Sequence, residues 1–195
     1  MTDTAVPARP DGEGRPDGGR PDDGLRLSAP GPEDGPRLWR LARDCGLDLN
    51  SPYAYTLWCR DFARTSVIAR EADGTPVGFV TGFMRPDEPG TYFLWQVGVD
   101  PRMRGRRLAR RMLDHLAERF GDLGASYLEA TVTPDNGASR ALFGSFARAR
   151  GTEPVWSPLF AAEHFPEDGE PGAGDGHEPE DLVRIGPLGR PPAAR

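Results

Sequence analysis

Apolar residues are concentrated in the middle of this 195-residue chain. Residues 1–24 and 188–195 are rich in Pro, Gly and charged residues and carry few apolar side chains. Such segments bury too little surface to offset the entropy that a chain loses on folding, so we expect disordered tails at both ends. Residues 25–187 contain the apolar patterns and are expected to form a single domain.

Four segments of this domain have apolar residues at the spacing of an amphipathic helix. In the third segment Leu108, Met112 and Leu116 repeat every four residues, and Phe120 continues the same face. A glycine follows the first segment, where it would end a helix. The predicted helices cover residues 33–44, 52–62, 106–120 and 136–146.

Seven further segments have the alternation, or the content of β-branched and aromatic residues, that is typical of strands. Asp73-Gly74 between two of them predicts a tight hairpin. Because a helix separates the strand that ends at Val99 from the next strand, these two are expected to pair in parallel. The prediction is an α/β protein with a mixed, mostly antiparallel sheet and helices on both faces. The strands cover residues 25–28, 65–71, 77–84, 91–99, 127–132, 155–160 and 182–185.

The strand that ends at Val99 runs into a turn with an unusual charge. Six arginines lie between Arg102 and Arg111 without an acid among them, although the chain has a formal net charge of -6. A strand that leads into a helix N-terminus presents unpaired N–H groups and the positive end of the helix dipole, which together bind anions. The turn is therefore either a polyphosphate site or a basic turn on a solvated helix.

The residues around this turn resemble the acetyl-CoA-binding motif of the GNAT acetyltransferase superfamily, whose core is Arg/Gln-x-x-Gly-x-Gly/Ala. Val97-x-Val99 precedes Arg102-Met103-Arg104-Gly105-Arg106-Arg107-Leu108-Ala109, and the helix motif Asn136-x-x-Ser139-x-x-Leu142-Phe143 follows the next strand. Arg107 departs from the motif, which has Gly or Ala at that position. The resemblance implies the GNAT acyltransferase fold, in which the parallel strand pair is splayed, and acetyl-CoA as the co-substrate.

The same resemblance implies roles for individual residues. The backbone N–H groups of Val97 and Val99 are expected to bind pantetheine, and the Val97 N–H is the candidate oxyanion donor. Phe143 stands where many GNAT enzymes carry a tyrosine that protonates the leaving thiolate, so this chain lacks that acid. The other expected cofactor contacts are Arg104, Gly105, Arg106, Arg107 and Leu108 at the pyrophosphate, and Asn136, Ser139 and Phe143 on the downstream helix.

Further motifs resemble the diaminobutyrate acetyltransferase family of ectoine biosynthesis. In chain order they are Leu47-Asp48-Leu49-Asn50-Ser51-Pro52-Tyr53-x-Tyr55, Phe93-Leu94-Trp95-Gln96-Val97, Thr133-Pro134-Asp135-Asn136-x-Ala138-Ser139 and His177-x-x-Glu180. The resemblance implies transfer of acetyl to the side-chain amine of L-2,4-diaminobutyrate by direct attack in a ternary complex, and a homodimer. The alternatives are a GNAT enzyme for another small amine and a module that binds acetyl-CoA without catalysis.

A small diamino acid carries ammonium groups, so its pocket should present carboxylates. Asp48 and Glu180 are the candidate cation holders, Trp95 is a candidate wall, and Tyr53 and His177 complete the expected substrate site. The alternatives are that Asp48 caps a turn, that Trp95 belongs to the core and that His177 lies in an exposed loop. Tyr53, His177 or water is left to transfer protons.

The overall charge and composition narrow the possible partners. The acidic balance argues against a nucleic-acid partner and fits a cationic substrate. No run reaches the roughly 20 apolar residues that span a membrane, and the first residues lack a signal-peptide pattern, so a cytoplasmic protein without membrane contact is expected. Cys45 and Cys59 make neither a disulfide framework nor a metal cluster, and no metal is expected. Residues 163–181, with eight acids and two histidines, are expected to form an acidic loop on the substrate side.

Overall fold

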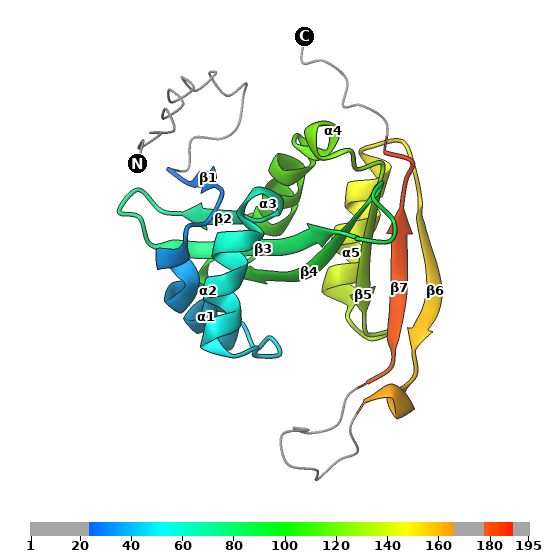
Figure 1. The fold of residues 1–195 in the computed structure, drawn as a ribbon, viewed down its shortest axis with the longest axis horizontal. Coiled ribbons are helices and arrows are strands. Elements are labelled where there is room, and N and C mark those ends of the chain that lie inside the picture. Colours follow the sequence, from blue (N-terminus) through cyan, green and yellow to red (C-terminus); the bar gives the residue numbers. More distant parts are fainter. Residues whose placement is uncertain (1–23, 166–177, 189–195) are drawn as a thin grey trace, which may run out of the picture.

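A central sheet with helices on both faces organises the molecule (Figure 1). The computed structural model describes residues 24–165 and 178–188. Almost all of both predicted tails, most of the acidic segment and His177 lie outside the described residues. The sheet has seven strands in the order β1-β2-β3-β4-β5-β7-β6, and β4 and β5 form its parallel pair. This arrangement confirms the predicted α/β class with a mixed, mostly antiparallel sheet.

None of the described helices is long and apolar enough to cross a bilayer.

The observed strands and helices follow the predicted pattern closely. The strands are β1 (Arg26–Ser28), β2 (Val67–Arg70), β3 (Pro76–Met84), β4 (Thr91–Val99), β5 (Tyr127–Val132), β6 (Pro154–Phe160) and β7 (Glu180–Ile185). The helices are α1 (Gly35–Asp44), α2 (Pro52–Asp61), α3 (Leu108–Ala117), α4 (Phe120–Leu123) and α5 (Gly137–Arg148), with 3-10 turns η1 (Pro32–Asp34), η2 (Ala63–Thr65), η3 (Pro101–Met103) and η4 (Ala162–His164).

Successive side chains along the central strands point to opposite faces of the sheet, so the core has two layers. Ile68 and Phe79 point to the face that α1 and α2 cover, where they pack with Leu38. Val80 points to the opposite face and belongs to the larger core, to which Phe146 of α5 contributes. Burial on both faces therefore explains why the middle strands are apolar almost throughout.

The predicted helix over residues 106–120 is wrong at both ends. The helix α3 begins at Leu108, because Gly105 and Arg107 adopt left-handed backbone conformations with φ of 77° and 56°. At its other end the helix stops at Ala117, and Phe120 opens the separate short helix α4. Leu108, Met112, Leu116 and Phe120 are nevertheless all buried, as the periodicity predicts.

A β-bulge in β4 separates the two parallel strands. Thr81 of β3 pairs with Gln96 and Gly82 pairs with Leu94, so Trp95 is an extra residue without a partner in β3. The parallel pairing of β4 with β5 ends at the same place, because its last pair is Leu94 with Ala130. A bulge bends and twists its own strand. The splayed pair that the sequence predicts therefore opens at Trp95.

Where β4 and β5 are still paired, a buried carboxylate joins β5 to β7 and to the residue that follows β3. Glu129 of β5 has a side chain only 2% exposed, and it accepts a hydrogen bond from Arg85 Nη1 at 2.8 Å and another from Arg184 of β7. Both guanidinium groups also pair with Glu88, at 3.1 Å each. Two acids and two arginines thus balance their charges, which is the condition under which an ionic group is tolerated in the interior.

We expect Glu129→Ala to lower the free energy of unfolding by about 3 kcal/mol, because it removes the buried partner of two arginines and leaves them only Glu88 to share. In thermal unfolding this corresponds to a loss of roughly 6–12 °C in Tm. Glu88→Ala is the matched control, since Glu88 belongs to the same network but its side chain is 44% exposed, and its effect should be much smaller. Equal effects of the two substitutions would contradict the structural role given to Glu129.

Candidate functional site

A cavity of about 700 Å³ lies where β4 and β5 separate. The wall formed by β4 includes Trp95, Gln96 and Val97, and the wall formed by β5 continues through Thr133. The bulge and the end of the parallel pairing therefore create this space. The cavity is lined by Leu47, Asp48, Leu49, Asn50, Phe83, Arg85, Phe93, Leu94, Trp95, Gln96, Val97, Glu129, Ala130, Thr131, Val132, Thr133, Asn136, Ser139, Phe143, Leu159, Phe160, Phe165, Glu180 and Leu182.

Aromatic side chains form one side of the cavity. The Trp95 ring stacks on Trp58 of α2 with 5.7 Å between ring centroids and 27° between ring planes. Phe83 and Phe93 lie beside this stack, with 5.4 Å between their centroids. Trp95 remains 47% exposed, so one face of the indole is supported while the other is open. This position fits a wall of the cavity better than a core residue.

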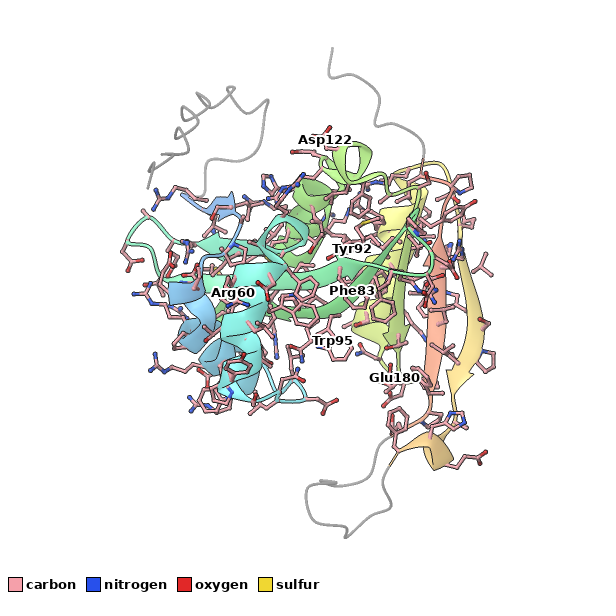
Figure 2. The ribbon with its side chains drawn as sticks, viewed as in Figure 1. Arg60, Phe83, Tyr92, Trp95, Asp122 and Glu180 are labelled. Carbon is pink, nitrogen blue, oxygen red and sulfur yellow. The ribbon has the colours of Figure 1, made fainter. Side chains whose placement is uncertain are left out.

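Two of the predicted acidic residues reach the cavity. Asp48, in the loop between α1 and α2, and Glu180, the first residue of β7, both line it, although they are 132 positions apart in the chain. Figure 2 shows Trp95 and Glu180 on the same side of the molecule, at the opening of the split strands. Carboxylates beside an open indole face provide a site for a small organic cation.

Tyr53 does not contribute to the cavity as predicted. Its side chain is 72% exposed, whereas Tyr55 is only 3% exposed, and neither tyrosine lines the cavity. Two positions along an α-helix correspond to a rotation of about 200°, so these tyrosines point to opposite sides of α2. The inward position belongs to Tyr55, which the sequence interpretation did not assign to the site.

The sequence interpretation missed Gln96, which lines the cavity, and Tyr55, which does not line it but bonds to Gln96. The Tyr55 hydroxyl donates to Gln96 Oε1 at 3.0 Å, and Gln96 Nε2 donates to the Asp48 carbonyl oxygen at 2.8 Å. Burial raises the pKa of the Tyr55 hydroxyl, so the group stays protonated and acts as a donor. Gln96 lies inside the motif beside Trp95, which was the available signal. Its contact with a residue 41 positions away was not readable from the sequence.

The free edge of β4 presents backbone N–H groups to the opening. Asp100 N–H donates to the Val77 carbonyl oxygen of β3 at 2.9 Å. Since successive backbone N–H groups in a strand point to alternate sides, those of Val97 and Val99 point away from β3. Within the described strands, pairing with β5 does not extend that far. The edge of the strand therefore offers donors to an extended ligand that adds to the sheet.

The basic turn that follows β4 supplies a second set of donors. Arg111 N–H donates to the Arg107 carbonyl oxygen at 3.0 Å, which is the first regular bond of α3. The N–H groups of Leu108, Ala109 and Arg110 precede that bond and stand at the positive end of the helix. Gly105 lies in the exposed turn just before them. This is the backbone geometry that binds a phosphate.

Four of the six arginines of the turn show two different arrangements. Arg102 is held by Asp100, with 2.9 Å from Nη2 to Oδ2, and Arg110 is held by Asp114 at 2.8 Å. The exposed side chains of Arg104 and Arg107 make no hydrogen bond or ion pair within the described residues. The Arg107 side chain is exposed to solvent and does not fill the space in front of the α3 N-terminus. Its guanidinium is therefore available to an anion above the turn.

The N-terminus of α5 forms the remaining wall. Asn136 accepts a hydrogen bond from Ser139 N–H at 3.0 Å and so caps the helix. Asn136, Ser139 and Phe143 all line the cavity. The Phe143 side chain is only 1% exposed and offers no proton donor or acceptor. Among the described residues, no group of three or more His, Cys, Asp or Glu side chains is arranged to hold a metal ion.

The fold and this cavity define the class of protein. Residues 36–147 match the model of the acetyltransferase (GNAT) family. The chain belongs to this family, as the motif around Gly105 predicts. The GNAT fold with its splayed parallel pair is thereby confirmed.

Relatives of known function place the chain more narrowly. It is 50% identical over 168 residues to an L-2,4-diaminobutyric acid acetyltransferase from Streptomyces avermitilis, covering 85% of this chain and 90% of that protein. A relative of the same name from Streptomyces coelicolor is 51% identical over 166 residues, covering 84% of this chain and 94% of the relative. These similarities confirm the narrower family resemblance of the sequence.

A solved structure supports the same grouping. The diaminobutyrate acetyltransferase EctA from Paenibacillus lautus, in complex with its substrate L-2,4-diaminobutyric acid and coenzyme A, aligns with a TM-score of 0.77. The two chains are 38% identical, and the alignment covers 85% of this chain and 96% of that one. The free edge of β4, the N-terminus of α3 and the exposed side chains of Arg104 and Arg107 in the present chain provide groups that fit coenzyme A.

Arg107 can be tested directly, since it is the one described residue other than glycine with a positive φ. We expect Arg107→Gly to raise the KM for acetyl-CoA about 3- to 10-fold, because a charge-assisted contact to phosphate is lost. Stability should stay unchanged or rise by up to about 1 kcal/mol, since glycine accepts the left-handed conformation.

Arg107→Ala is the matched control for this prediction. It removes the same charge but keeps a side chain in the left-handed conformation, so it should reproduce the change in KM without any gain in stability. If the KM for acetyl-CoA stays at the wild-type value in both variants, Arg107 does not bind the phosphates. Steady-state kinetics with acetyl-CoA and thermal unfolding provide the two readouts.

Proposed function

We propose that this protein transfers the acetyl group of acetyl-CoA to the side-chain amine of L-2,4-diaminobutyrate, the acetylation step of ectoine biosynthesis. The main support for this proposal is that one cavity contains two carboxylates, those of Asp48 and Glu180, and the open face of the Trp95 indole, next to the free edge of β4. The names of the relatives and the ligands of the Paenibacillus lautus structure support this substrate. A sequence without lysine, with acids at the cavity, suits a diamine.

In the proposed arrangement, one end of the cavity binds the amine substrate and the other end binds the cofactor. Asp48 and Glu180 bind the ammonium groups of the substrate, Trp95 covers its aliphatic carbons, and His177 belongs to the same site by resemblance. The backbone N–H groups of Val97 and Val99 bind the pantetheine arm. The turn from Arg104 to Leu108 binds the pyrophosphate. The cofactor and the amine thus approach each other at the bulge, where β4 leaves β5.

The reaction we propose is direct transfer within a ternary complex. The ammonium group that is to be acetylated first gives one proton to water or to a nearby side chain, and the neutral nitrogen then forms a bond with the carbonyl carbon of the thioester. The nitrogen loses a second proton to the same acceptor as the carbon–sulfur bond breaks, and coenzyme A leaves as the thiolate. Negative charge that develops on the carbonyl oxygen faces the Val97 N–H. Because Phe143 has no proton to give, solvent or a side chain outside α5 must protonate the thiolate.

The proposal is tested by incubating the purified chain with acetyl-CoA and L-2,4-diaminobutyrate. We expect release of free coenzyme A and formation of the 4-N-acetyl product, identified by NMR. Turnover only with other diamines or amino acids would replace the substrate but keep the enzyme class. Binding of coenzyme A in calorimetry without turnover of any amine would instead support a non-catalytic module.

Substitutions at the acids test the amine site. We expect Asp48→Ala and Glu180→Ala each to raise the KM for L-2,4-diaminobutyrate about 10- to 150-fold, as the loss of a charged hydrogen bond of about 1.5–3 kcal/mol requires. The KM for acetyl-CoA should change less than about twofold. Asp122→Ala is the control, because this exposed acid lies in α4, away from Trp95 and Glu180 (Figure 2). Equal changes in both KM values would remove the acids from the amine site.

A homodimer and a cytoplasmic location are further parts of the proposal. Val155, Leu159 and Phe160 in the edge strand β6 are 66%, 41% and 42% exposed, and this apolar edge supports association with a second copy. Light scattering on the purified protein distinguishes a dimer from a monomer.

A further inference from the structure

Gln96 connects the sheet to the loop that carries Asp48. In a regular strand, successive side chains point to opposite faces. The bulge at Trp95 breaks this alternation, and both Trp95 and Gln96 turn toward α2: Trp95 stacks on Trp58, and Gln96 accepts from Tyr55. The bulge therefore places a polar side chain directly beside the indole wall of the cavity.

The two ends of the Gln96 amide have different partners. Its oxygen accepts from the Tyr55 hydroxyl at 3.0 Å, and its nitrogen donates to the Asp48 carbonyl oxygen at 2.8 Å. Together the two partners fix the orientation of the amide. Only a group that accepts at one end and donates at the other satisfies both bonds, so glutamate or leucine cannot replace it.

Tyr55 provides a rigid support for this amide. Its side chain is only 3% exposed, and its ring packs edge-on against Phe79 of β3, with 6.5 Å between centroids and 87° between planes. By contrast, the loop that follows α1 is exposed, and Leu49 in it is 46% exposed. The bond from Gln96 thus fixes the main chain of an exposed loop, at Asp48, to a buried support.

We infer that Gln96 and Tyr55 are positioning residues for the amine subsite, acting through Asp48. This inference rests on the proposed function, in which the Asp48 carboxylate binds an ammonium group of the substrate. Tyr55 orients the Gln96 amide, the amide holds the Asp48 main chain, and the Asp48 side chain is thereby kept at the cavity beside Trp95. Neither positioning residue needs to touch the substrate.

The test uses steady-state kinetics of Tyr55→Phe and Gln96→Leu. We expect each substitution to raise the KM for L-2,4-diaminobutyrate about 3- to 10-fold, the effect of losing one or two neutral hydrogen bonds. The kcat and the KM for acetyl-CoA should stay within about twofold of wild type. Since the Tyr55 hydroxyl bonds to Gln96 and also to Asn50 of the same loop, Tyr55→Phe should raise the KM of the Gln96→Leu variant by less than it raises that of the wild type.

Tyr92→Phe is the matched control. This substitution also removes the hydroxyl of a buried tyrosine. The Tyr92 hydroxyl donates to the Thr65 carbonyl oxygen at 2.9 Å, and Tyr92 does not line the cavity. This variant should leave the KM for the diamine unchanged. If Gln96→Leu does not fold, the milder Tyr55→Phe carries the comparison with Tyr92→Phe alone.

A second cycle separates this inference from the proposed function. In an Asp48→Ala background, Gln96→Leu should no longer change the KM for the diamine, because its effect passes through Asp48. An effect of Gln96→Leu that persists in that background, or one that changes the KM of both substrates equally, overturns the inference. Absence of any turnover of L-2,4-diaminobutyrate by the wild-type protein would instead overturn the proposed function.

Discussion

The site depends on one extra residue in β4. With Trp95 unpaired, the strand cannot keep its register with β5, and the parallel pairing stops at Leu94 and Ala130. The opening that results exposes a row of backbone donors on one edge and brings an indole and an amide to the same face. If β4 and β5 stayed paired here, the backbone donors of β4 would be used in hydrogen bonds to β5, and no space would open between the strands. The cavity therefore exists because the sheet is interrupted there.

The charged residues are placed to suit two ligands of opposite charge, a cationic amine and an anionic phosphate. Acids reach the cavity from the loop before α2 and from the start of β7, while arginines are gathered in the turn after β4. Asp100 and Asp114 hold two of these six arginines, Arg106 contacts the Met103 sulfur, and the exposed Arg104 and Arg107 are available to a phosphate. Glu129 lines the cavity as well, but Arg85 and Arg184 neutralise it. Its role is to hold the strands that frame the opening.

Much of this architecture was predictable from the sequence because it follows from periodicity. Burial on both faces makes β3 continuously apolar, and helical spacing identified the buried face of α3. The anion site was predictable as well, since arginines clustered between a strand and a helix N-terminus favour a negatively charged ligand. The start of α3 was misplaced, because a left-handed arginine does not show in the spacing of apolar residues.

The details of the amine site were less accessible. A bulge adds one residue without altering composition, so the alternation around Trp95 gave no sign of it. The choice between Tyr53 and Tyr55 depends on the rotation of α2 about its axis, which tertiary packing sets. The bond between Tyr55 and Gln96 joins distant segments, and only the folded chain brings them together.

A crystal structure of this protein with coenzyme A and L-2,4-diaminobutyrate tests the central claim most directly. The account predicts pantetheine along the free edge of β4 at Val97 and Val99, and the diamine between Trp95 and the carboxylates of Asp48 and Glu180. It also predicts that the amine and the sulfur of the cofactor face each other at the bulge. A diamine bound outside the split between β4 and β5, or β4 and β5 paired beyond Leu94, would contradict it.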